Sequence, residues 1–320
     1  MKLLSVSLLA GTLATPALAC DLCSIYSAAQ ARAEIGKGFS VSLAEQFTSY
    51  GTLQQDSAEV ANGTGQFFDS SVTQIVTAYH FTERFGVQFN LPVIRRSFAR
   101  PEGAAFETGT VSGLGDAALA FNLEAFRWEA KHATFAWSLL GGVKLPTGSA
   151  DRLQEEVDEL TAPPPPPGRE SAIHGHDLAL GSGSVDGIIG TSVYARWQRV
   201  YFSAAMQYGL RTTGRFGYRH AADVTWAGGP GCYLALNDNY TVALQLNVTG
   251  ETKGQDTFAL MGGRMPDTAV TTVFVGPQIA VTWAEQFSAE AGVELPVSRR
   301  NTALQVVPDY RVRAGITWRF

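Results

Sequence analysis

The sequence has little charge and no long apolar run. Charged residues make up 17% of the 320 residues, against roughly 25% in a typical soluble domain. The absence of 18 consecutive apolar residues excludes a helix that spans a bilayer. Acidic residues number 29 and Lys and Arg together 24, so there is no basic excess and we expect no nucleic-acid partner.

Cysteine is also scarce, with three in the chain. Cys20 and Cys23 form one Cys-x-x-Cys pair without a second ligand pair, so they make a poor metal site. Ser24 follows, which excludes a haem-attachment motif, and we expect no cofactor and no metal. The pair is either disulfide-bonded or carries a lipid on Cys20. Cys232 is expected to fill space in an apolar strand.

The N-terminal segment has the pattern of a secretory signal. Lys2 is followed by an apolar run over 3–14 and then by Ala17-x-Ala19, which predicts a signal peptide over 1–19. Residues 20–37 then form a periplasmic segment or a plug of the domain that follows.

What is abundant is alternation between apolar and polar residues, from residue 38 to residue 320. Strict alternation predicts β-strands, and runs of nine to twelve residues match the roughly 9–11 that a tilted membrane strand needs. Twelve strands are predicted, at 38–52, 66–81, 85–96, 109–126, 132–146, 180–197, 200–212, 221–237, 240–251, 270–283, 287–298 and 309–320.

Short and long connections alternate between these strands. An even strand count with turns at one end and loops at the other is typical of an outer-membrane barrel. We therefore predict an all-β fold, a closed antiparallel transmembrane β-barrel of about 12 strands with short periplasmic turns and long extracellular loops. Aromatic residues gather near the short turns, as an interfacial girdle would: Tyr79, Phe81, Phe85, Trp128, Trp197, Phe202, Tyr240, Trp283 and Phe287.

The last strand carries a more specific signal. Tyr310, Val312, Ala314, Ile316, Trp318 and Phe320 alternate with polar residues or glycine. This strand resembles the final strand of bacterial outer-membrane barrels, which ends in Phe. The resemblance implies that Phe320 is recognised by the barrel-insertion machinery.

Several residues conflict with the simple pattern. Glu45 falls on the outward parity of the first strand, which predicts a bulge or a place near the rim. Pro230 and Pro277 fall inside strands, where a missing N–H donor is tolerated mainly at bulges and edges. Leu-Pro pairs at 91–92, 145–146 and 295–296 are expected to mark the long-loop ends of strands.

The inward-facing side chains of the strands are polar and carry charges of both signs, so we do not expect an interior that strongly attracts anions or cations. Glu294 should lie near Arg311 and Arg313 in a salt-bridged wall, the alternative being a ladder that guides a substrate. The predicted pore-lining residues are Gln88, Asn90, Asp116, Asn122, Glu124, Lys144, Arg196, Arg211, Gln245, Glu290, Glu294, Arg311 and Arg313.

The 147–179 loop combines an acidic stretch, a proline run over 163–167 and a His-rich stretch. The prolines favour an extended, solvated spacer. His174, His176 and Asp177 are expected to be exposed and polar, with metal binding as the alternative.

Three motifs carry a resemblance to a known family. Gly113-Leu-Gly-Asp116, Lys144-Leu-Pro-Thr-Gly148 and Gly181-Ser-Gly-Ser-Val-Asp186 resemble those of the outer-membrane barrels named for the meta-pathway of phenol degradation. The resemblance implies a transporter of hydrophobic compounds.

Together these features predict a channel in the outer membrane of a Gram-negative cell. It would pass a small, aromatic or hydrophobic solute passively and would not be an enzyme. Its partners would be the lipid bilayer, the solute and the insertion machinery, and we expect a monomer. One alternative is a structural barrel that anchors a periplasmic or electron-transfer partner. The other is an outer-membrane lipase, for which His220 is the best catalytic candidate.

Overall fold

The computed structural model describes residues 37–103, 105–237 and 239–320, with Met261 described in its backbone only. The expectations for the signal peptide 1–19, for the pair Cys20 and Cys23, and for the plug over 20–36 lie outside these residues. Within the described ranges, no helix has the length and hydropathy that a membrane span requires.

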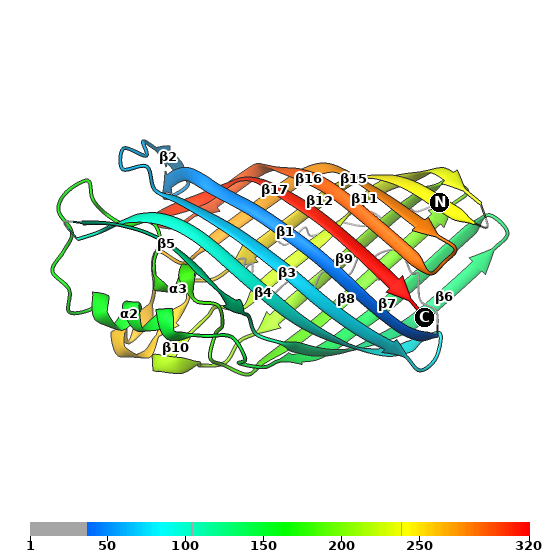
Figure 1. Ribbon diagram of the computed structural model, residues 1–320, viewed down its shortest axis with the longest axis horizontal. Coiled ribbons are helices and arrows are strands. Elements are labelled where there is room, and N and C mark those ends of the chain that lie inside the picture. Colours follow the sequence, from blue (N-terminus) through cyan, green and yellow to red (C-terminus); the bar gives the residue numbers. More distant parts are fainter. Residues whose placement is uncertain (1–36, 104, 238) are drawn as a thin grey trace, which may run out of the picture.

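The described chain forms one closed antiparallel sheet, drawn as an elongated barrel in Figure 1. Its strands are β1 (Gly38–Gln55), β2 (Ala58–Val60), β3 (Phe67–His80), β4 (Phe85–Glu102), β5 (Ala105–Leu114), β6 (Ala118–Ala130), β7 (Ala133–Lys144), β8 (Asp186–Trp197), β9 (Val200–Leu210), β11 (Asp223–Leu236), β12 (Tyr240–Lys253), β15 (Val270–Trp283), β16 (Phe287–Asn301) and β17 (Leu304–Arg319).

Smaller elements lie in the long loops. The loop after β7 holds a 3-10 helix, η1 (Asp151–Leu153), and two short helices, α2 (Gln154–Glu159) and α3 (Gly175–Leu178). The other loops contribute 3-10 helices η2 (Arg215–Gly217) and η3 (Ala259–Met261), and a small sheet of β10 (Tyr218–Arg219), β13 (Thr257–Phe258) and β14 (Gly263–Arg264). Figure 1 shows α2, α3 and β10 at the end opposite the chain's C-terminus.

The barrel closes between its first and last strands. β1 pairs with β17 from Ser40–Arg319 to Gln55–Leu304, interrupted by irregular pairing near Tyr50. Twelve of these strands make the ring, because β2 pairs only with β1 and β5 only with β4. Every neighbouring pair of the ring is antiparallel, so the prediction of a closed antiparallel barrel is confirmed.

The side-chain distribution is that of a membrane protein. The exposed parity of the strands carries large apolar side chains, such as Phe89, Leu123 and Ile279, while the buried parity carries polar ones, such as Asn90, Asn122 and Gln88. An apolar exterior suits hydrocarbon, and complete strand pairing is what hydrocarbon demands of a spanning sheet. The predicted transmembrane barrel thus follows from packing as well as from topology.

Two strand predictions need correction. The single strand expected over 109–126 is split into β5 and β6, which pair with the upper and lower halves of β4 respectively. The strand expected from residue 180 begins only at Asp186, because residues 179–182 bond to the loop after β7: the N–H groups of Leu180 and Gly181 donate to Ser149 O.

The Leu-Pro prediction is also mostly wrong. Only Leu145–Pro146 follows the end of a strand; Pro92 lies inside β4 and Pro296 inside β16. Pro92 falls where the partner of β4 changes from β6 to β5. Pro296 lies at a register shift in the β15–β16 ladder. The missing N–H is therefore placed at an interruption in each case.

The same reasoning accounts for Pro230 and Pro277, which the sequence analysis places inside strands. The β11–β12 ladder skips from Gly228 to Gly231 and so passes over Pro230. The β15–β16 ladder skips from Val275 to Gln278 and so passes over Pro277. The expectation that these prolines lie at irregularities is confirmed.

The prediction for Glu45 is wrong. The pairing of β1 with β3 and with β17 runs without a shift on either side of Glu45, so there is no bulge. The residue lies near the middle of β1 rather than at its rim. The polar groups that surround it are described below.

The nine residues of the predicted aromatic girdle are exposed, and several of the rings at this end touch. Tyr79 contacts Phe81 with ring centroids 5.0 Å apart, and Phe81 contacts Phe85 at 5.8 Å. Across the seam, Phe39 contacts Phe320 at 5.9 Å. These side chains lie at the short-turn end, where a membrane interface favours amphipathic rings.

Deleting Phe320 is expected to lower the yield of folded barrel. Its N–H donates to Phe39 O at 2.9 Å and its ring contacts both Phe39 and Trp318, so the deletion removes the last bond of the seam. We expect roughly a tenfold loss of the form that resists denaturation in unheated electrophoresis. Lys131→Ala in the β6–β7 turn serves as the control, because Lys131 is exposed. Equal yields from the deletion and the control would contradict the prediction.

Candidate functional site: a capped lumen

The predicted pore-lining residues occupy the inner side of the wall. Most are buried because they contact one another across neighbouring strands. Asn122 Nδ2 donates to Gln88 Oε1 at 2.8 Å, and Asn90 Nδ2 donates to Gln74 Oε1 at 3.4 Å. Glu124 is bonded instead to Arg127 at the short-turn end of β6.

A row of alternating charges crosses the wall near the long-loop end. Lys144 Nζ lies 2.8 Å from Asp116 Oδ2 and 2.9 Å from Asp186 Oδ2. Arg211 Nη1 lies 2.9 Å from the same Asp186 oxygen, and Arg211 Nε lies 2.7 Å from Asp223 Oδ1. All five side chains are buried. A buried charge is tolerated only when paired, so this charge row forms one mutually dependent unit.

The three Gly-rich motifs contain Asp116, Lys144 and Asp186 of this charge row. They also connect the 145–185 loop to it. Ser182 N–H donates to Asp116 Oδ2 at 2.8 Å, and Gly148 N–H donates to Asp116 Oδ1 at 3.0 Å. A Cβ added at Gly181 would lie 2.6 Å from Asp116 Oδ1. Glycine is thus required for the loop to approach the carboxylate this closely.

A second group of polar side chains joins the last strands. Glu294 accepts hydrogen bonds from Asn247 Nδ2 at 2.8 Å and from Thr249 Oγ1 at 3.0 Å, and lies 3.6 Å from Arg313 Nη1. Asn247 and Thr249 belong to β12, so Glu294 reaches past β15. It does so at Gly276, where an added Cβ would collide with Val293 O at 1.8 Å.

Arg311 is fully buried and lies beside Glu294, its register partner, as expected. It also forms an ion pair with Glu251, which the sequence did not predict. Its guanidinium lies 4.1 Å from the Phe274 ring centroid, and its Nε donates to Thr48 Oγ1. Glu290, further down the same wall, accepts from Gln278 Nε2 at 3.0 Å.

Tyrosines line the interior toward the short-turn end. The hydroxyls of Tyr194 and Tyr233 are 2.8 Å apart, and the rings of Tyr201 and Tyr233 lie 5.0 Å apart. Tyr201 Oη also donates to Gln245 Oε1 at 3.3 Å. Nearby, Arg196 donates to Thr134 Oγ1. Sequence reasoning gave Gln245 and Arg196 but not the aromatic cluster, because the tyrosines come from three separate strands.

The long-loop mouth is closed by the 145–185 loop itself, which we call the cap. Ile173 and Leu178 are fully buried against Phe68 and Phe98, which stand on the inward parity of β3 and β4. Leu180 packs in the same way against inward residues of these strands. The loop therefore folds into the mouth. The expectation of an exposed spacer holds only for the proline run 163–167, which is fully exposed.

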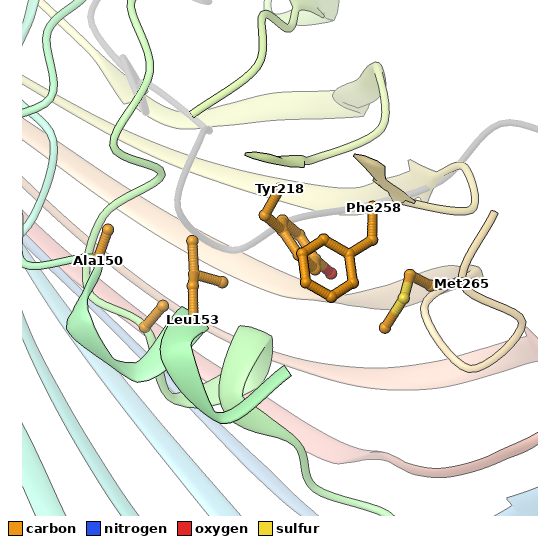
Figure 2. Packing of buried hydrophobic residues seen from close by; sticks show 6 residues of the cluster. Ala150, Leu153, Tyr218, Phe258 and Met265 are labelled. Atoms are coloured by element: carbon orange, nitrogen blue, oxygen red, sulfur yellow. The ribbon is translucent and has the colours of Figure 1, made fainter. Parts of the chain in front are cut away.

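A second cluster packs the cap against the opposite loops. Leu153 and Ala150 from the cap meet Tyr218, Phe258 and Met265 from the other long loops, as Figure 2 shows. Four of these five side chains are at most 1% exposed. Burial of this kind stabilises the closed arrangement by about 25 cal/mol per Å² of apolar surface.

Two arginines on β4 fasten the cap from the barrel side. Arg96 Nη1 donates to the carbonyls of Asp177 and Ala179, the latter at 2.7 Å. Arg100 donates to Ile173 O at 3.2 Å and to Glu155 at 2.8 Å. Sequence analysis missed both residues. Their signal was basic side chains at inward parity: Arg96 is the last residue of the predicted strand 85–96, and Arg100 lies beyond its predicted end, because β4 continues to Glu102.

The His-rich stretch is part of the cap rather than an exposed loop. His176 Nδ1 lies 2.8 Å from Glu156 Oε1, and its backbone N–H donates to the same oxygen at 2.7 Å. His174 stacks on His176 with ring centroids 5.7 Å apart and faces Glu159 and Asp267. Among the described residues no group of His, Cys, Asp and Glu has the arrangement of a metal site.

The charges on this pair are shifted by their surroundings. Burial by itself would lower the pKa of His176, but Asp177 and Glu156 raise it to about 10. Burial would raise the pKa of Glu156, but His176 lowers it to about 2. The pair therefore joins α2 to α3 as a buried ion pair at neutral pH.

These shifts predict how the closed cap depends on pH. The His176 contribution is complete below its ordinary pKa of 6.5 and is lost as pH rises through about 10. The Glu156 contribution is complete above 4.5 and is lost as pH falls through about 2. We expect the cap to resist protease best between these ordinary values and to become more sensitive on either side. His176→Asn should flatten the alkaline increase in cleavage, and His132→Asn in a short turn should not.

His220, the candidate for hydrolytic chemistry, is buried at the rim. Its Nδ1 lies 3.4 Å from Asp256 Oδ2, and its ring packs on Tyr218 at 5.1 Å. Asp256 also accepts from Tyr218 Oη and Lys253 Nζ, each at 2.6 Å. Among the described contacts of His220 there is no serine hydroxyl, so the triad that a lipase needs is not assembled around it.

Comparison with solved structures shows which known fold this chain shares. No protein-family model matches the sequence, and no curated protein matches it. An outer membrane channel from Pseudomonas putida F1 superposes with a TM-score of 0.60 at 15% identity, over 89% of this chain and 97% of that one. Two other structures are more distant. The β domain of the Bordetella autotransporter BrkA has a TM-score of 0.42 at 12% identity, over 88% of this chain and 99% of that one. The monoaromatic hydrocarbon channel CymD has a TM-score of 0.38 at 6% identity, over 90% of each chain. The likeness to the Pseudomonas putida channel confirms the predicted barrel fold.

Proposed function

We propose that this chain is an outer-membrane channel for passive passage of a small, aromatic or hydrophobic solute. One observation carries the proposal: the strands are apolar on the exposed side and polar on the buried side. A twelve-stranded barrel is wider than the eight-stranded kind that side chains fill. Its interior can therefore hold a narrow path.

The cap supports a gated rather than a permanently open path. It closes the mouth through two apolar clusters and through Arg96 and Arg100. Its helices are short and its outer stretch is exposed, so it can move as a unit while the barrel wall stays intact. Passage would thus require displacement of the cap.

The solute class rests on the sequence resemblance and on the tyrosine cluster. Tyr194, Tyr201 and Tyr233 offer ring faces and hydroxyls on one side of the interior. Aromatic rings pair favourably with other aromatic rings. No triad is assembled around His220 in the described part of the chain. We propose that the barrel selects its solute by its lining residues and its narrowest part, rather than catalysing a reaction.

Flux through purified, full-length protein in liposomes tests the proposal. Vesicles that contain the protein should swell in arabinose faster than protein-free vesicles. Benzyl alcohol should reduce the single-channel conductance more than an aliphatic alcohol of equal hydrophobicity. Absence of conductance in both the full chain and a variant without the cap would overturn the channel function.

A further inference from the structure

A carboxylate on β1 interrupts the apolar exterior. Glu45 stands on the outward face between Leu43 and Phe47. Along the same strand, Phe39 lies in the girdle at the short-turn end, and Phe47 contacts Tyr310 at 6.0 Å at a higher level. The carboxylate therefore lies between two aromatic levels, at the depth of the hydrocarbon. An ionisable residue at that depth calls for a functional explanation.

Neighbouring polar side chains on β3 continue the interruption. Ser71 Oγ donates to Glu45 Oε1, and Thr73 Oγ1 donates to Glu45 Oε2. Further up, Ser49 Oγ donates to Asp69 Oδ1 at 2.7 Å. These residues alternate with inward ones in an unbroken register, so they share the lipid-facing side.

β4 adds a cation to the same face. Arg95 is exposed, pairs in register with Ser71 and makes no ion pair with any described residue. Ser97 beside it bonds to Thr110 at 3.1 Å. We call this set the outer polar patch: Glu45, Ser49, Asp69, Ser71, Thr73, Arg95 and Ser97.

The contrast with other parts of the wall is sharp. Below the register shift in β16, the outward positions are all apolar: Phe287, Ala289, Ala291, Val293, Leu295 and Val297. Lipid tails offer no hydrogen bonds. The part of the outer polar patch at or below the level of Phe47 includes Glu45, Ser71 and Thr73. It is therefore poorly matched to lipid and better matched to protein.

We propose that the outer polar patch is the contact between two copies of this chain. Four of its seven side chains are Ser or Thr, and small residues let two walls approach closely, as they do between membrane helices. It also carries both signs of charge, so it is complementary to itself. A two-fold axis makes the same surface meet itself and brings Arg95 of one copy against Asp69 of the second. The proposed dimer differs from the monomer that the sequence analysis expects.

The mass of the full chain in mild detergent tests the dimer. The native sequence should give twice the mass of one chain. Glu45→Leu combined with Ser71→Val and Thr73→Val should give a single chain that still resists denaturation without heating. Thr191→Val, on the outward face of β8, is the matched control and should leave the dimer unchanged. A native protein of single mass, or a triple variant that remains dimeric, would overturn the proposal.

Charge reversal keeps the proposal testable if the triple variant fails to fold. Asp69→Arg and Arg95→Asp should each weaken dimerisation at least about tenfold, and the two together should restore it. Failure of the double variant to recover the dimer mass would overturn the pairing.

Photo-crosslinking in the native membrane identifies the molecule that contacts the outer polar patch. With two differently tagged copies expressed together, a crosslinker at Ile75 should join the two tags, while one at Ile189 should not. Adducts to lipopolysaccharide or to another protein without a two-tag product would refute self-contact.

Discussion

Replacing residues 151–178 with a short glycine–serine linker is expected to raise the arabinose swelling rate of proteoliposomes about tenfold. The replacement removes Leu153, Ile173 and Leu178 from the two apolar clusters. It also removes the carbonyl of Ile173, which Arg100 binds. The barrel strands and the charge row remain, so the mouth opens while the wall is kept.

The matched control replaces only the exposed stretch 162–168 with the same linker. It shortens the loop but leaves α2, α3 and both clusters in place, so its swelling rate should equal that of the native protein. Equal rates for both replacements would show that the cap does not limit passage.

Lys144→Met is expected to lower the free energy of unfolding by about 3–5 kcal/mol. Lys144 is the cation between Asp116 and Asp186, so its loss leaves two buried carboxylates, of which only Asp186 retains a cation, Arg211. Removing one member of a buried pair is costly because the remaining charge is left without compensation.

Urea unfolding in detergent, followed by tryptophan fluorescence, measures the effect. Lys131→Met is the control, because Lys131 is exposed in the β6–β7 turn. Adding Asp116→Asn to Lys144→Met should recover part of the loss. A midpoint for Lys144→Met as high as that of the control would mean that the charge row contributes nothing to stability.

The barrel was predictable because its signal is local. Alternation along each strand reports which side chains face lipid, and it needs no knowledge of distant residues. The prolines show the limit of that reading. Pro92 and Pro296 look like strand ends in the sequence, but their missing N–H groups fall at ladder interruptions, which depend on how neighbouring strands pair.

The cap was not predictable because its contacts are distant in sequence. Ile173 and Leu178 are buried only because Phe68 and Phe98 lie on the facing inner wall. A proline run and a His-rich stretch normally indicate a solvated loop. The charge row shows the intermediate case: Asp116 and Lys144 were predicted as pore-lining residues, but their pairing with each other and with Asp186 required the register.

Accessibility of a spin label placed in turn at residues 287–298 of β16 tests the central claim most directly. The claim is that the exposed, apolar parity of the strands faces hydrocarbon and the polar parity faces an interior. In lipid vesicles, collisions with oxygen should peak at Ala289, Ala291 and Val293, and collisions with a water-soluble nickel complex should be low there. Labels at Ser288, Glu290 and Glu294 should show low oxygen accessibility. Loss of this two-residue period, or nickel accessibility at the apolar positions, would contradict a membrane-spanning barrel.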